Sequence, residues 1–126
     1  MSELLTVSKE NYLLTLLELS GENGSVRSAD IAAHMNISRA SVSHSMVRLR
    51  QDGYVFMERY GPVRLSGKGR AIAQEIRNRQ RVIKAFLMSN LGINDDIAAQ
   101  QASQMEPLMH EETIVSIRIH TQACGQ

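Results

Sequence analysis

Residues 36–53, NISRASVSHSMVRLRQDG, constrain the fold most, because they predict one short helix with both of its ends marked. Ser38 suits the N-cap, where a hydroxyl accepts a hydrogen bond from a backbone N–H of the first turn. Gly53 suits the left-handed position that ends a helix. Apolar residues at helical spacing predict the buried face: Ala40, Val42, Met46 and Leu49. The opposite face is polar and basic: Arg39, Ser41, Ser43, His44, Arg48 and Arg50.

The residues just upstream predict a shorter helix over residues 28–35, with Ser28 as its cap. Its inward residues are expected to be Ile31, Ala32 and Met35. Two short helices joined by a tight connection are typical of a helix-turn-helix, whose second helix enters the major groove and contacts base edges. The alternative interpretation is a pair of packed helices in an unrelated bundle.

The composition permits a folded protein of one compact domain, or of a small domain with an appended helical piece. The chain has 126 residues, 43% of them hydrophobic, and no apolar run approaches the length of a membrane span. Its first residues lack a signal-peptide pattern, and the only cysteine, Cys124, cannot form an internal disulfide. We therefore expect a soluble, cytoplasmic protein.

The net charge of +1 conceals an uneven distribution. Residues 27–84 contain twelve basic and four acidic side chains, a net charge of +8, whereas the remainder contains two basic and nine acidic ones, a net charge of −7. A basic centre with acidic ends is expected of a nucleic-acid-binding domain joined to another element. The alternative is a solvated basic helix, since five of the basic residues lie between Arg70 and Lys84.

Alternating apolar residues over residues 54–65, with a turn at Gly61-Pro62, predict a β-hairpin. A hairpin directly after a recognition helix is typical of the wing of a winged helix-turn-helix. Its basic and aromatic side chains suit contact with phosphates or the minor groove: Arg59, Tyr60 and Arg64. We add Arg27, which precedes the helix-turn-helix, to the expected DNA contacts.

Amphipathic patterns predict four further helices. They cover residues 8–20 with Ser8 as cap, about 67–90 after Ser66, Asn94 to the region of Pro107–His110, and 111–120, with a frayed tail beyond. The expected fold is mostly α with a small β-hairpin wing, in two parts.

Residues 1–70 would form a winged helix-turn-helix DNA-binding domain, and residues 71–126 a helical dimerisation domain. The apolar faces after residue 70 are too wide for one another, so we expect a homodimer.

Four segments together resemble the diphtheria-toxin-repressor and manganese-transport-regulator family: ENYLLTLLEL, SADIAAHMNISRASVSHSMVRLRQDGYV, ERYGPVRLSGKGR and LGINDDIAAQQASQMEPLMHEET. The resemblance covers most of residues 8–120, and the central two segments are specific together. It implies a metal-activated, dimeric repressor with a winged-helix domain and a helical dimerisation domain. We expect no counterpart of the SH3-like third domain that some members carry.

The resemblance also implies which residues read DNA: Ser38, Arg39, Ala40, Ser41, Ser43 and His44. His44 stands where members often have glutamine or lysine. An imidazole can still donate or accept a hydrogen bond, so the departure changes the expected sequence preference rather than DNA reading itself.

The positions that match the family's metal ligands mostly carry poor donors: Asn11, Leu14, Gln80, Lys84, Ser103 and Pro107. Only Glu106 keeps a carboxylate, and one carboxylate is not a transition-metal site. His110 follows four residues later and would share its helical face if the helix continued past Pro107. Glu106 and His110 are therefore the remaining candidate ligands for manganese or iron, helped by a neighbouring methionine. The alternative is a surface glutamate and a histidine that begins the last helix.

Three functions remain open. The first is a dimeric DNA-binding transcriptional regulator that acts on a double-stranded operator, with its metal switch lost or rebuilt. The second is a manganese- or iron-responsive repressor with altered ligands. The third is a winged-helix protein-interaction module, which the basic central segment disfavours because docking surfaces are depleted in lysine. An enzyme is not expected, since the chain shows no phosphate-binding loop and no nucleophile with a base.

Overall fold

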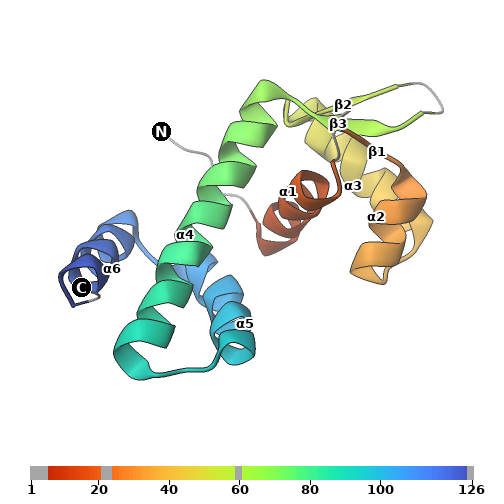
Figure 1. Ribbon diagram of the computed structural model, residues 1–126. Coiled ribbons are helices and arrows are strands. Elements are labelled where there is room, and N and C mark those ends of the chain that lie inside the picture. Colours follow the sequence, from red (N-terminus) through yellow and green to blue (C-terminus); the bar gives the residue numbers. More distant parts are fainter. Residues whose placement is uncertain (1–5, 21–23, 59–60, 125–126) are drawn as a thin grey trace. The chain divides into compact units, whose positions relative to one another are not determined.

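The computed structural model describes residues 6–20, 24–58 and 61–124 (Figure 1). Within these ranges the chain forms six α-helices, one 3₁₀ turn and three short strands. In chain order they are α1 (Val7–Leu19), β1 (Ser25–Val26), α2 (Ser28–Met35), α3 (Arg39–Gln51), β2 (Val55–Met57), β3 (Val63–Leu65), α4 (Gly67–Leu91), α5 (Asp95–Met105), η1 (Glu106–Leu108) and α6 (Glu111–Cys124). The mostly helical fold with a β-hairpin wing is confirmed. Two compact units, residues 1–74 and 75–126, divide within α4.

The core of the first unit lies between α1, α2, α3 and a small sheet. The apolar stripes expected on α1 and α3 are buried: Tyr12, Leu13, Leu16 and Leu17 on α1, and Val42, Met46 and Leu49 on α3. Ala40 was expected on the same face and is exposed instead. It precedes Val42 by two residues, which is about 200° around a helix and therefore on the opposite side.

The caps of the first three helices differ in part from the sequence-based expectation. Ser38 caps α3 as predicted, and its Oγ accepts a hydrogen bond from the Ser41 N–H at 3.1 Å. The prediction for Ser8 is wrong, because Thr6 accepts the bond from the Lys9 N–H, so that α1 begins at Val7. The prediction for Ser28 is also wrong: the N-cap of α2 is Arg27, and no side chain accepts a bond there.

The predicted hairpin is present and belongs to a three-stranded antiparallel sheet in the order β1-β3-β2. Val55 pairs with Leu65, and Met57 with Val63, which directs Val55, Val63 and Leu65 into the core. Strand β1 pairs with β3 and was not predicted. A two-residue strand is too short to show the period of two that identifies strands in a sequence.

Ser66 ties the hairpin to its neighbours on both sides. Its Oγ accepts a hydrogen bond from the Gly69 N–H at 3.0 Å, which caps α4, and donates one to the Gly53 carbonyl at 2.7 Å. The Ser66 N–H donates to the Tyr54 carbonyl at 2.9 Å. The end of α3, the hairpin and the start of α4 are therefore fixed relative to one another inside the first unit.

In the second unit a smaller core forms around Ile83, Leu87, Ala98 and Ala102. Asn94 caps α5 by accepting from the Ile97 N–H at 3.0 Å. The expected continuation of α5 to Pro107–His110 is wrong, since the α-helix ends at Met105 and Pro107 lies in η1. Proline lacks the N–H that an uninterrupted helix needs.

The last helix is longer than expected. Helix α6 continues to Cys124 rather than ending at His120, and the Thr121 Oγ1 donates to the Ile117 carbonyl at 2.8 Å in its last turns. In the part of the chain that the structure describes, none of the helices has the length and apolar character needed to cross a membrane.

Candidate nucleic-acid interface

Helix α3 presents a polar and basic face to solvent because its apolar face is locked into the core. Val42, Met46 and Leu49 are fully buried, which fixes the rotation of the helix about its axis. The expected DNA-contacting residues of this helix and its cap are all exposed: Ser38, Arg39, Ala40, Ser41, Ser43, His44 and Arg48. Along this face, the described residues include no acidic side chain before Asp52, at the end of the helix.

The negative charge of the Asp52 carboxylate is balanced by a lysine. The Lys9 Nζ of α1 lies 2.9 Å from its Oδ2, and the Lys68 Nζ donates to its carbonyl at 3.1 Å. The Lys9 pair joins α1 to the C-terminal end of α3. The basic character of α3 is therefore not opposed by a free carboxylate at that end.

The two serines of the first turn have different capacities for a ligand. The Ser38 Oγ accepts from the Ser41 N–H and donates to the Ser41 Oγ at 2.9 Å, so Ser38 is occupied by capping. The Ser41 hydroxyl accepts in that bond and keeps its own proton, which can be donated to a phosphate or base acceptor. Ser38 therefore orients the first turn, and Ser41 has the free donor.

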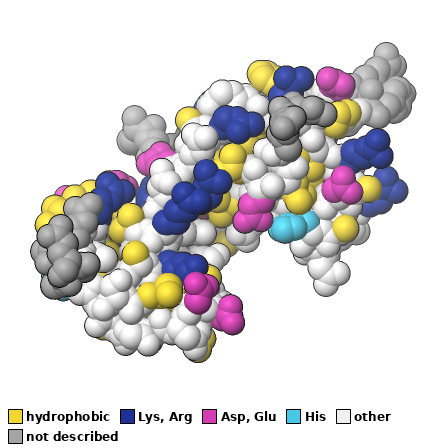
Figure 2. Space-filling view, in the orientation of Figure 1, with side chains coloured by type: hydrophobic (Ala, Val, Ile, Leu, Met, Phe, Trp, Pro, Cys, Tyr) yellow, Lys and Arg dark blue, Asp and Glu magenta, His cyan; other side chains and the backbone are white. Residues whose placement is uncertain are grey.

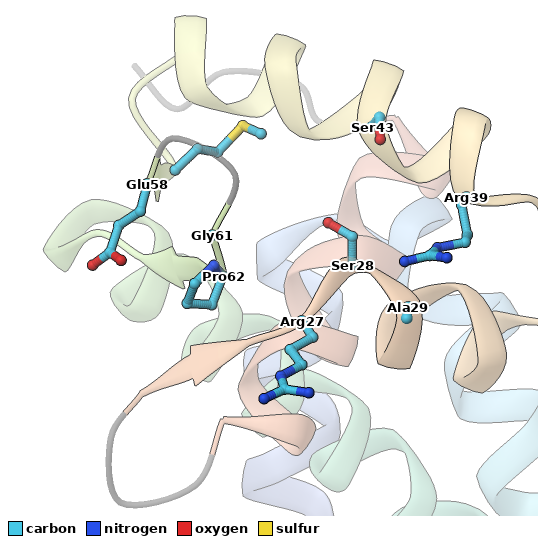
Figure 3. Close-up of a pocket in the computed structure, with 9 residues that line it drawn as sticks. Arg27, Ser28, Ala29, Arg39, Ser43, Glu58, Gly61 and Pro62 are labelled. Carbon is cyan, nitrogen blue, oxygen red and sulfur yellow. The ribbon is translucent and has the colours of Figure 1, made fainter.

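A groove with a cavity volume of about 660 Å³ runs beside α3, between the start of α2 and the hairpin (Figure 3). The groove is lined by Arg27, the N-cap of α2, by Ser28 of α2, by Arg39 and Ser43 of α3, and by Pro62 of the hairpin. In Figure 3 the Arg39 side chain turns toward Ser28, whereas the Glu58 carboxylate points away from Arg39. The uncapped first turn of α2 adds the positive end of a helix dipole, so the groove suits an anionic group.

A second hollow, of about 290 Å³, lies on another side of α3, against α1. It is lined by Lys9 and Ser8 of α1 and by His44 and Arg48 of α3. Lys9 was missed by the sequence-based reasoning, because only the fold brings α1 beside the recognition helix. Basic residues therefore line hollows on two sides of α3, as a helix between two phosphate strands requires.

Of the hairpin residues expected to contact DNA, the structure describes Arg64. Arg64 is exposed on β3 and pairs across the sheet with Phe56, whose side chain is also exposed. Arg59 and Tyr60, which were expected at the tip, lie outside the described residues.

The position of the expected metal ligand is taken by an ion pair. The Glu106 carboxylate is fully buried, and its Oε2 accepts from the Arg79 Nη2 at 2.6 Å. The Arg79 Nη1 lies 3.5 Å from Glu75 and 3.6 Å from Glu111. Burial alone would lower the pKa of Arg79, but the hydrogen bond to Glu106 and the charges of Glu106, Glu111 and Glu75 outweigh it and raise that pKa above its ordinary value. Arg79 is therefore permanently charged.

His110 does not lie one helical turn beyond Glu106 on a common helix. Met109 is extended between them, and the His110 carbonyl accepts from the Thr113 and Ile114 N–H groups at the start of α6. The helical spacing on which the pairing of Glu106 with His110 depended is absent.

The donor set does not fit a transition metal. Lys84, at a family ligand position, is paired with Asp95 at 3.2 Å. Over the described ranges, no group of three or more His, Cys, Asp or Glu side chains is placed to hold a metal ion. With Glu106 bound to a guanidinium, a divalent transition metal lacks the several converging ligands that it needs.

Both parts of the chain match families of known proteins. Residues 4–63 match the family described as iron dependent repressor, N-terminal DNA binding domain, and residues 66–124 match iron dependent repressor, metal binding and dimerisation domain. The transcriptional regulator MntR of Escherichia coli O157:H7 is 33% identical over 116 residues, which are 92% of this chain and 74% of the relative.

Two further proteins are similar over most of the chain. The diphtheria toxin repressor of Corynebacterium jeikeium is 27% identical over 113 residues, 90% of this chain and 47% of the relative. The crystal structure of T. acidophilum IdeR superposes with a TM-score of 0.76 at 26% identity, covering 90% of this chain and 53% of that one. The winged-helix fold followed by a helical domain is thus shared.

Proposed function

Because the chain belongs to the iron-dependent repressor family, we propose that it is a dimeric transcriptional regulator that binds an operator in duplex DNA through α3. Residues 1–70 would bind the DNA and residues 71–126 would hold the dimer. The proposed activity is binding without catalysis, and its expected location is the cytoplasm, where operator DNA is accessible.

The single observation that carries the proposal is the pair of basic hollows that flank α3. Arg27 and Arg39 lie in one, and Arg48 lies in the other beside Lys9, whose charge is paired with Asp52. A recognition helix in the major groove has a phosphate strand on each side, so this arrangement supports phosphate contacts on both flanks. Ser41, Ser43 and His44, exposed between the arginines, are the proposed base-reading side chains.

Dimerisation through the second unit is supported by apolar side chains that its own fold leaves exposed. Figure 2 shows hydrophobic side chains at the surface around α6. The largest exposed ones in this unit are Leu91, Ile97, Leu108 and Ile119, of which Leu108 is 83% exposed. Exposed apolar surface of this extent is typical of an interface, and a symmetric dimer buries the same surface on both chains.

The test is selection of bound sequences from a random duplex library, followed by affinity measurement by fluorescence anisotropy at several salt concentrations. The double variant Arg39→Ala with Arg48→Ala should bind the selected duplex at least about tenfold more weakly, with a salt slope smaller by about four, because each of the two protomers loses two phosphate contacts. Arg118→Ala, an exposed arginine of α6, is the control and should leave both quantities unchanged. Failure to select any sequence, or equal binding by the double variant, would show that α3 is not a DNA-reading helix.

A further inference from the structure

One guanidinium joins three elements of the second unit. Arg79 belongs to α4, Glu106 to η1 and Glu111 to α6, and both carboxylates lie within 3.6 Å of Arg79, with Glu75 one helical turn before it on α4. Among the described residues of this unit, Glu106 is the only charged side chain that is fully buried. The cluster therefore lies at a cross-link between elements rather than on a solvated helix face.

We propose that Arg79 is a built-in cation that takes the place of a divalent metal at Glu106. Its guanidinium supplies the positive charge that a bound ion would supply and links the same carboxylate to neighbouring helices. The second unit then reaches its folded arrangement without metal. This inference does not rest on DNA binding and holds for the unit by itself.

The burial of Glu106 explains why a cation is required. A buried carboxylate without a partner is strongly unfavourable, whereas a charge-assisted bond at 2.6 Å compensates for the lost water. An arginine cannot be deprotonated in the physiological range, so this charge is always present. Glu75 and Glu111 are mostly exposed and are screened by water, so they contribute much less than Glu106.

The pair also explains why a metal would compete poorly. The Arg79 side chain is covalently tethered beside Glu106, and an incoming ion would have to displace it and leave a guanidinium, 24% exposed, without its main partner. The Glu106 Oε1 has no hydrogen-bond partner in the described structure, so only one carboxylate oxygen is held by Arg79. Glu75 and Glu111 lie 3.5 and 3.6 Å from the Arg79 Nη1, whereas Glu106 binds Nη2. Removal of Arg79 would therefore leave a buried carboxylate without a cation, and the described residues would still provide no group of three ligands to hold a metal in its place.

Thermal unfolding of the full chain in chelator and in Mn²⁺ tests the proposal, with Arg79→Ala compared with Arg81→Ala. Arg81 is exposed on the same helix and is the matched control. Wild type and Arg81→Ala should have the same Tm in both solutions. Arg79→Ala should have a Tm about 10 °C lower in both solutions, because a buried charge is left unpaired. The double variant Arg79→Ala with Glu106→Gln should recover at least half of that loss in both solutions, because no buried charge then lacks a partner.

The free-ion signal of Mn²⁺ in electron paramagnetic resonance gives a second measurement that does not require a stable variant. Wild type and Arg81→Ala should leave this signal unchanged. If Arg79→Ala is unfolded, the double variant Arg79→Ala with Glu106→Gln takes its place in the Tm comparison and should fold where the single variant does not. Stabilisation of wild type by Mn²⁺, a reduced free-ion signal in the presence of wild type, or equal stability of Arg79→Ala and Arg81→Ala would each overturn the proposal.

Discussion

The start of α4 allows a sharp test of how the wing is held, through the change Gly69→Ala. A Cβ at this position would lie 2.0 Å from the Tyr54 carbonyl oxygen and 3.2 Å from the Leu65 Cδ2. The carbonyl cannot simply rotate away, because it accepts the hydrogen bond from the Ser66 N–H at 2.9 Å. Relief of the overlap therefore requires a shift of α4 away from the hairpin.

The magnitude follows from three contributions. Overpacking in a closely packed contact costs about 1–3 kcal/mol. Weakening of the Ser66–Tyr54 hydrogen bond adds about 1 kcal/mol, and the better helix propensity of alanine offsets about 1 kcal/mol. We therefore expect Gly69→Ala to lower the free energy of unfolding by about 2 kcal/mol. Gly67, two residues earlier in the same helix, has no neighbouring atom within 4 Å of such a Cβ.

Urea unfolding followed by circular dichroism measures both variants. Gly67→Ala should be as stable as wild type or slightly more so, whereas the urea midpoint of Gly69→Ala should fall with an unchanged slope. Because the same contact positions the hairpin, Gly69→Ala should also weaken operator binding. Equal urea midpoints for the two alanine variants would show that α4 does not approach the Tyr54 carbonyl this closely.

Three other changes test separate parts of the structure. Ser38→Ala should cost about 1 kcal/mol in urea unfolding through loss of the α3 cap, and no loss would mean that the cap is not formed. Ile119→Asp, on the exposed face of α6, should convert the dimer into a monomer in sedimentation velocity, and a dimer of unchanged stability would place the interface elsewhere. A group with a raised pKa contributes stability that is lost only as pH rises through that pKa. The stability difference between wild type and the double variant Arg79→Met with Glu106→Gln, which leaves no unpaired buried charge, should therefore stay constant from about pH 6 to 9, and a marked change in this range would contradict a permanent charge on Arg79.

Elements with local end signals could be predicted from the sequence. Ser38 and Gly53 mark the ends of α3, and Asn94 marks the start of α5, because caps depend on side chains within a few residues of the helix end. The start of α1 was misplaced for the same kind of reason: Thr6 and Ser8 both carry suitable hydroxyls, and local sequence does not distinguish them.

Tertiary partners could not be predicted in this way. The helical spacing of Glu75 and Arg79 was visible in the sequence, but the pairing of Arg79 with Glu106 depends on how η1 folds back beside α4. Lys9 lines the hollow beside α3 only because α1 packs there, which no local sequence pattern predicts.

Operator affinity measured with and without metal most directly tests the claim that this DNA-binding regulator has an arginine in place of a metal. The intact protein should bind its selected duplex in a chelator with a Kd of about 10 nM or tighter at physiological salt. Addition of equimolar Mn²⁺ or Fe²⁺ should change that Kd by less than about twofold. Two results would contradict this claim. One is the absence of specific binding in the chelator, and the other is an affinity gain of about tenfold or more on adding metal, if the Glu106→Ala variant lacks that gain.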